Sequence, residues 1–157
     1  MRNRRWDYLA ANALGRAVYA DIFDGRTAPP NHVRYVFLDD RARSFFDDWP
    51  AVAHETTRIL RSEAGRDPLD PEPAELIEEM AQTSAEFRAI WSQHDVRLPA
   101  AGLHRFHHPH VGELDLVFEA AALRADPGLT LLLATAQQGS TTEAAPRRLS
   151  AKTTRVE

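Results

Sequence analysis

The chain has 157 residues, of which 43% are hydrophobic, and this is enough for one domain with its own core. It contains no cysteine, which excludes disulfides and thiol chemistry, and its apolar runs are too short to cross a bilayer. The net charge is −4, with basic clusters only at Arg2–Arg5 and Pro146–Arg155, which argues against a dedicated nucleic-acid module. We therefore expect a soluble cytoplasmic protein whose two basic clusters are solvated tails.

The first part of the chain predicts one strand followed by short helices. Alternating apolar side chains favour a strand over Arg5–Ala11. Asn12 is a suitable N-cap for a helix that ends near Gly25, and the Pro-Pro pair within Thr27–Asn31 requires a loop. The next segment, His32–Leu38, is apolar, and its pattern is compatible with either a helix or a strand.

The middle of the chain predicts a series of helices. Asp39 or Asp40 can cap a short helix, and Asp48 offers an N-cap for a longer helix that stops at Gly65. A proline-rich connector then leads into another helix. Thr83–Glu86 has the form of a capping box, which predicts that the helix restarts there.

The last third of the chain changes to the two-residue period of strands. Leu103–His108 and Glu113–Glu119 predict two strands joined by a turn. The apolar run Leu129–Ala136 predicts a central strand that is covered on both faces. From Gly139 onward, serine, threonine, alanine and charged residues predict a disordered tail.

The order of these elements favours a single α+β domain with helices packed on one face of an antiparallel sheet. We place this domain at residues 5–138. Residues 1–4 are an N-terminal remnant and residues 139–157 form the tail.

Five of the seven histidines lie between residues 94 and 110, which suggests a metal site. His104 and His108 are four residues apart on the predicted strand, which is roughly 13 Å at the usual rise. Both would have to lie about 2 Å from a shared zinc ion, so the two cannot bind one metal together. A histidine-dependent metal enzyme would need ligands from elsewhere. We keep it as an alternative and predict no metal site.

No other pattern predicts catalysis. No serine lies in a G-x-S-x-G motif, and the glycines are too few and scattered for a loop that binds phosphate. Adjacent carboxylates such as Asp47 and Asp48 more often cap helices than share a proton. We therefore expect a protein that is not an enzyme and that holds no cofactor.

The aromatic residues are expected to form either a plain core or the wall of a cavity. A sheet that faces helices is a common place for an apolar pocket with a few polar groups. Arg88 would suit an anionic head group, because a guanidinium can make two parallel hydrogen bonds to it. The candidate ligand-binding residues are the apolar side chains Phe37, Trp49, Trp91, Phe106, Leu116 and Phe118, and the polar side chains Asn12, Arg88, His94 and His108.

Several segments between residues 5 and 140 follow the pattern of one known family, in the same order. They are Arg5–Asn12, Leu38–Arg43, Asp47–Trp49, Ser84–Arg88, Trp91 with His94–Arg97, Phe106–Gly112, and Thr135-Ala136 with Gly139-Ser140. In these residues the chain resembles the ligand-binding domain of MmyB-like transcription regulators.

The resemblance implies a PAS-like fold and a small-molecule ligand, with a fatty acid bound in one member. In that family the domain follows an XRE-type helix-turn-helix in actinobacterial and other bacterial regulators, which act as dimers. No helix-turn-helix precedes Arg5 here, so we expect DNA contact only through a module absent from this chain. The first strand is expected to be missing or reduced to residues 1–4, which would leave an exposed sheet edge.

We therefore expect a sensing domain in which a small apolar or amphipathic ligand shifts the population of arrangements within a homodimer. The alternative from another class is a degenerate domain that only mediates protein association.

Overall fold

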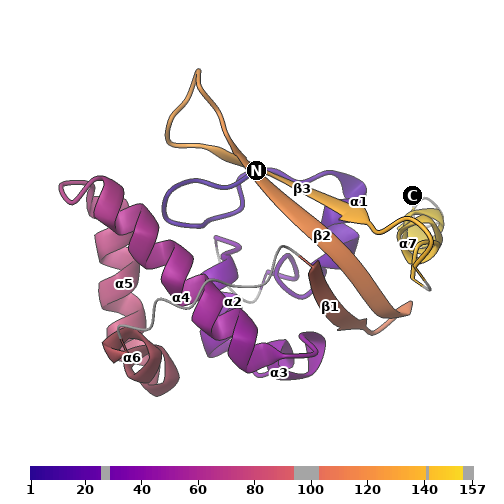
Figure 1. Cartoon of the computed structure of the whole chain (residues 1–157), viewed down its shortest axis with the longest axis horizontal. Coiled ribbons are helices and arrows are strands. Elements are labelled where there is room, and N and C mark those ends of the chain that lie inside the picture. The colour runs from indigo at the N-terminus through magenta and orange to yellow at the C-terminus, as the bar shows by residue number, and fades with distance from the viewer. Residues whose placement is uncertain (26–28, 94–102, 141, 154–157) are drawn as a thin grey trace.

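The computed structural model describes residues 1–25, 29–93, 103–140 and 142–153. The elements are α1 (Ala13–Val18), α2 (His32–Leu38), α3 (Arg41–Phe45), α4 (Trp49–Arg66), α5 (Pro71–Thr83), α6 (Ala85–Ser92), β1 (Leu103–His108), β2 (Gly112–Ala122), β3 (Thr130–Ala136) and α7 (Ala145–Thr153). The predicted α+β class is confirmed. Helices α2 to α6 lie together on one side of the antiparallel sheet, and α1 and α7 pack against each other near the end of β3 (Figure 1). In the described part of the chain, no helix is long and apolar enough to span a membrane.

Polar side chains begin most of the helices. Asn12, Asn31, Asp48, Asp70 and Ser84 each accept a hydrogen bond from a backbone N–H two or three residues later. Such caps replace partners that the first N–H groups of a helix lack, and each contributes about 1 kcal/mol. The caps predicted at positions 12 and 48 are confirmed.

Other details of the helical region correct or complete the sequence-based predictions. Ser84 caps α6, whereas Thr83 ends α5, and the Thr83 hydroxyl donates to the Glu79 carbonyl at 2.7 Å. Of the two candidate caps before α3, Asp39 accepts the Arg41 N–H at 3.0 Å. The segment whose pattern fitted either a helix or a strand is helix α2.

The two faces of the sheet differ in what covers them. The register pairs Phe106 with Leu114, so side chains at even positions of all three strands share one face. That face is directed at the helices. The opposite face carries partly exposed apolar side chains, with 48% of Leu103, 38% of Leu131 and 47% of Leu133 accessible to solvent.

β3 is not the doubly covered central strand that the sequence predicted. It is the last strand in the order β1-β2-β3, and its odd-numbered leucines face away from the helices. On the outer edge of β3, Thr130 pairs with Arg2 of the N-terminal segment through two backbone hydrogen bonds, both 2.9 Å long. Beyond Thr130, no described strand pairs with this edge. The prediction failed because an apolar run does not reveal whether both of its faces are covered.

The strand predicted over Arg5–Ala11 is also wrong. A turn folds the first residues back, so that Arg2 forms isolated bridges with both Tyr8 and Thr130. Trp6 follows the turn with a φ of 66°, a region that is uncommon for residues other than glycine, so a regular strand cannot pass through it. Residues 1–4 thus take part in the sheet and cover the start of the edge that we expected to be exposed.

Residues 142–153 are not part of a disordered tail. Helix α7 packs against α1 and β2 and buries Ala145 and Leu149. The Thr142 hydroxyl accepts the backbone N–H of Asp115 in β2 at 3.1 Å. Composition was misleading here because a short helix needs only a few apolar side chains to dock on an existing core.

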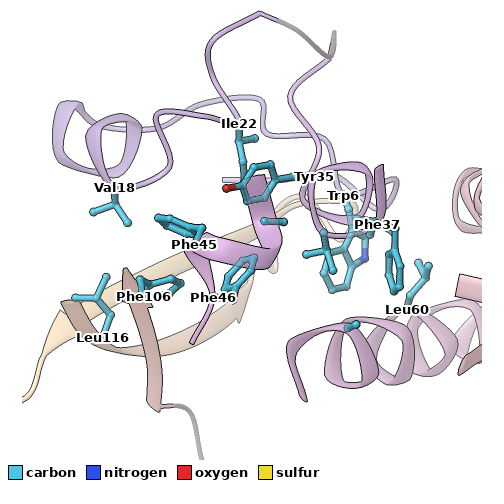
Figure 2. Close-up of a cluster of buried hydrophobic side chains, with 14 of the residues drawn as sticks. Trp6, Val18, Ile22, Tyr35, Phe37, Phe45, Phe46, Leu60, Phe106 and Leu116 are labelled. Atoms are coloured by element: carbon cyan, nitrogen blue, oxygen red, sulfur yellow. The ribbon is translucent and has the colours of Figure 1, made fainter. Parts of the chain in front are cut away.

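An aromatic cluster joins the helices to the sheet. The ring of Phe106 in β1 lies 5.1 Å from that of Phe45 and 5.6 Å from that of Phe46, measured between centroids. Tyr35 of α2 lies 6.0 and 6.1 Å from the same two phenylalanines (Figure 2). These separations are favourable for aromatic pairs. The cluster therefore fixes the spacing between the helical layer and the sheet.

The basic cluster Arg2–Arg5 is held by ion pairs and is not a solvated tail. Three of its arginines contact carboxylates on α4, on α5 and at the start of α5, which fastens the N-terminal segment to the helices. The pairs are Arg2–Glu63 at 2.8 Å, Arg4–Asp70 at 2.5 Å and Arg5–Glu75 at 2.5 Å.

Replacing Leu149 in α7 by alanine tests whether this helix belongs to the domain. Leu149 is 3% exposed, and truncation of a buried leucine costs about 2–5 kcal/mol. We expect Leu149→Ala to lower the free energy of unfolding by at least about 2 kcal/mol in urea titrations, and the exposed control Arg148→Ala to change it by less than about 0.5 kcal/mol. Equal stabilities for the two variants would support the disordered tail instead.

A second prediction concerns acid stability. The Glu79 carboxylate accepts two hydrogen bonds from Arg34, both 2.6 Å long, and these hold the pKa of Glu79 below its ordinary value of 4.5. A lowered native pKa stabilises the fold above pH 4.5, and this contribution is lost as the pH falls through the native pKa. We expect Glu79→Gln to cost about 1 kcal/mol at neutral pH and progressively less below about pH 4.5.

The measurement is urea unfolding between about pH 3 and 7 for both proteins. Glu78→Gln is the matched control, because Glu78 is an exposed neighbour beside Gln82. A cost for Glu79→Gln that does not change with pH would contradict the electrostatic account.

Candidate functional site

Two adjoining cavities lie between the even face of the sheet and the helices. The first, which we call the Arg2 cavity, has a volume of about 360 Å³ and is bordered by the N-terminal segment, α2, α4, β2 and β3. The second, the α1–α7 cavity, has a volume of about 740 Å³ and extends around the outer edge of β3, where Leu131 and Leu133 also border it. Tyr8, Tyr19, Phe118 and Leu132 border both and form their shared wall. Both volumes are typical of small-molecule pockets.

A buried arginine lies at the polar end of the Arg2 cavity. Arg2 is 5% exposed, and its backbone bridge to Thr130 fixes it at the sheet edge. Its Nη2 donates to Glu63 at 2.8 Å, and its guanidinium carbon lies 3.5 Å from the centroid of Trp6. Burial lowers the pKa of Arg2 and Glu63 partly opposes this, but an arginine stays charged. Its Nη1 is buried and has no hydrogen-bond partner among the described residues.

Glu63 compensates the charge of Arg2. One carboxylate oxygen accepts the Arg2 hydrogen bond, and the other accepts the indole N–H of Trp6 at 2.6 Å. These charge-assisted bonds fix the guanidinium and the indole relative to each other. The charge of Arg2 is therefore balanced, while one of its donor groups remains unpaired.

His32 is a second polar group in the same wall. Its ring lies 5.9 Å from that of Trp6 and 6.2 Å from that of Tyr19. Burial, reinforced by the charge of Arg2, lowers the pKa of His32 to about 3, so the imidazole is neutral at physiological pH. Part of the side chain borders the cavity, yet its Nδ1 is buried without a described hydrogen-bond partner. An unpaired buried polar atom costs about 1–3 kcal/mol, which a suitable ligand can recover.

The shared wall contains two tyrosines that stay protonated. Burial raises the pKa of Tyr8 to about 12 and raises the pKa of Tyr19 well above its ordinary value. Both hydroxyls are therefore neutral at physiological pH. With Phe118 and Leu132, the two rings give the wall a largely apolar character.

Three of the ten candidate ligand-binding residues border these cavities. Phe118 borders both, and Leu116 and Asn12 border the α1–α7 cavity. The Asn12 side-chain oxygen already accepts the Gly15 N–H, as the cap of α1. Contact of these three residues with a ligand stays a prediction.

Four other candidates lie in or beside the contacts between helices. The ring of Phe87 packs 5.2 Å from Phe37 and 5.4 Å from Trp91, and Trp49 lies 6.3 Å from Phe37. Arg88 is exposed and donates to a backbone carbonyl of α5 at 2.7 Å. The structure does not bring these four residues to either cavity.

Two candidates from β1 are part of the core, and one cannot be placed. Phe106 is fully buried in the aromatic cluster. The Nδ1 of His108 accepts the His110 backbone N–H at 3.1 Å, so its Nε2 carries the proton and donates to the Ala17 carbonyl at 2.9 Å. His94 lies outside the described residues.

The clustered histidines do not converge on one point. The Nε2 of His104 lies 3.6 Å from Glu55, and that of His107 lies 2.8 Å from Asp47. Across the described ranges, no three histidine, aspartate or glutamate side chains are placed to hold one metal ion. His104 and His107 are each near a different carboxylate, and His108 contacts His110, so these side chains do not share one site.

The residues that form the polar end of the Arg2 cavity are not among the ten candidates predicted from the sequence. Neither Arg2 nor His32 was predicted to bind a ligand, although Trp6, which packs against both, lies within the segment Arg5–Asn12 that carries the resemblance. Arg2 was assigned to a solvated tail because charged residues near chain ends usually are exposed. Its burial depends on Glu63, 61 residues away in the sequence, which no local pattern reveals.

Comparison with known proteins agrees with this geometry. No curated protein matches the chain. The family described as the MmyB-like transcription regulator ligand binding domain matches residues 1–149, a range that contains the whole sheet and every described residue that borders the two cavities. The chain therefore belongs to the MmyB-like transcription regulator ligand-binding domain family, and it is a ligand-sensing domain of a transcription regulator.

Proposed function

We propose that this domain binds a small apolar or amphipathic molecule, such as a fatty-acid-like compound, between the sheet and the helices. The observation that carries the proposal is the pair of adjoining cavities, which share an apolar wall and have a buried arginine at one end. This distribution suits an elongated ligand with one polar end, because apolar walls bind the chain and a few polar groups orient it. Membership of the family supports a small-molecule ligand.

We propose further that the ligand acts through the N-terminal segment. Arg2, Trp6 and Tyr8 of this segment border the Arg2 cavity, and its arginines are paired with α4 and α5. A ligand that contacts these residues favours one arrangement of the segment over others. In a cytoplasmic regulator, a separate helix-turn-helix module would contact DNA. Ligand binding to the sensing domain would change the affinity of that module for DNA through a coupling free energy that is typically 1–3 kcal/mol.

Filling the cavity tests the proposal. Ala120 of β2 borders the Arg2 cavity, whereas its neighbour Ala121 faces the opposite side of the sheet, and both are exposed. We expect saturated fatty acids of about 10–18 carbons to raise the melting temperature of the unchanged protein. Ala120→Leu should weaken binding by on the order of tenfold because it occupies the cavity, while Ala121→Leu leaves it unchanged.

The readouts are thermal shift across the panel and mass spectrometry of small molecules released by denaturing the purified protein. A melting temperature that no lipid or co-purified compound moves would remove the sensing proposal. Equal weakening by both leucine substitutions would place the binding site elsewhere.

The second candidate function is association with a second copy of the chain. The observation that favours it is the partly uncovered sheet face with Leu103, Leu131 and Leu133, because apolar patches of this kind often mark interfaces. Under this proposal, sedimentation velocity over a concentration series shows a dimer without any added ligand. Leu103→Lys, at a leucine that borders neither cavity, should shift the protein toward monomer, whereas Leu69→Lys, at a leucine that is 93% exposed between α4 and α5, should not. A concentration-independent monomer would rule this function out.

A further inference from the structure

The chemistry of the polar end restricts which head group the ligand carries. We propose that Arg2 and His32 bind a neutral carbonyl-bearing head group, such as an amide or an ester, in preference to a carboxylate. This inference rests on the proposed function and specifies the class of ligand that the same site takes.

Two unpaired polar atoms at this end, Nη1 of Arg2 and Nδ1 of His32, are themselves buried. Because both side chains border the cavity, a small rotation of each is needed to bring these atoms to a ligand. Nη1 of Arg2 is a donor, so it needs an acceptor oxygen. Nδ1 of His32 belongs to a neutral ring, and it either donates or accepts according to the tautomer. Both groups flank the ring of Trp6, at 3.5 Å for the guanidinium carbon and 5.9 Å for the imidazole centroid. An amide supplies a carbonyl oxygen for Arg2 and an N–H or a second acceptor contact for His32.

The charges at this end argue against an anion. Glu63 already balances Arg2, and the carboxylate oxygens of Glu63 are both hydrogen-bonded. The described charged residues that border the Arg2 cavity are two arginines, Arg2 and Arg66, and three glutamates, Glu55, Glu63 and Glu119. A ligand carboxylate at Nη1 would therefore add a negative charge beside Glu63, at a site that is poorly solvated. Like charges in such a site oppose each other, and one of them is driven toward protonation.

The apolar remainder of the ligand has a defined path from this end. Trp6, Tyr8 and Tyr19 lead from Arg2 toward Phe118 in the shared wall, and beyond it lies the larger α1–α7 cavity. The ring of Tyr19 lies 6.3 Å from that of Phe118. A chain laid along these rings points its head at Arg2 and its tail at α1 and α7.

A matched ligand series tests the inference on the full chain. The probes are tetradecanamide, methyl tetradecanoate and tetradecanoate, delivered from cyclodextrin at neutral pH and measured by titration calorimetry and thermal shift. We expect the amide and the ester to bind at least about tenfold more tightly than the carboxylate. Tighter binding of the carboxylate would overturn the inference, and equal affinities for all three would do the same, while both results leave the proposed function in place. Absence of binding by all three would overturn both.

The variant Glu63→Gln gives a sharper readout. It removes the charge that balances Arg2 at nearly constant shape, so the preference should move toward the carboxylate by about tenfold or more. Because the ratio of two affinities is measured on one variant, a general loss of stability cannot imitate the result. Arg2→Lys should weaken binding of the amide more than binding of the carboxylate. Lysine lacks the second terminal nitrogen of arginine, but it keeps the positive charge that attracts an anion. An unchanged ratio in Glu63→Gln would refute the role of charge.

Discussion

The two backbone hydrogen bonds between Arg2 and Thr130 determine where the polar end of the cavity lies. They add the first residues of the chain to the outer edge of β3, directly beside the face that the helices cover. From that position the Arg2 side chain extends to Glu63 of α4 and stacks on Trp6. A single backbone bridge thus places one charged side chain between sheet and helices. Without it, both the cavity wall and the ion pairs of the N-terminal segment would lose their common anchor.

The parts of the fold that could be predicted from the sequence are those with local causes. Asn12 and Asp48 are helix caps because their short polar side chains reach an N–H three residues ahead. The strand Leu103–His108 was recognisable from composition and the turn that follows it. In β2, Leu114 and Leu116 alternate with more polar neighbours as a half-buried strand requires. In each case the deciding contacts lie within a few residues or follow the period of one element.

The remaining features depend on contacts between distant residues. Leu131 and Leu133 look like core residues in sequence, yet nothing in the described structure covers their side of the sheet completely. Leu149 looks like part of a tail, yet α1 and β2 provide a surface on which it is buried. The candidate site shows the same limit. Phe37 and Phe118 are equally plausible wall residues by type, but only Phe118 faces the gap between the helices and the sheet. Residue type indicates that a side chain is buried, but it does not indicate which layer it lies in.

In the proposed mechanism, the unpaired Nη1 of Arg2 links specificity to signalling. Burial of an apolar chain contributes about 25 cal/mol per Å², which is similar for any chain of equal length, so it provides affinity with little discrimination. The unpaired donor costs about 1–3 kcal/mol in the protein alone, and only a ligand with an acceptor at that position recovers it. Specificity is therefore concentrated on a residue that also anchors the N-terminal segment to β3 and α4. A ligand that satisfies Arg2 stabilises this anchored arrangement, whereas one that only fills the apolar wall stabilises it less. In the proposed mechanism, head-group recognition and control of the N-terminal segment are therefore one physical event.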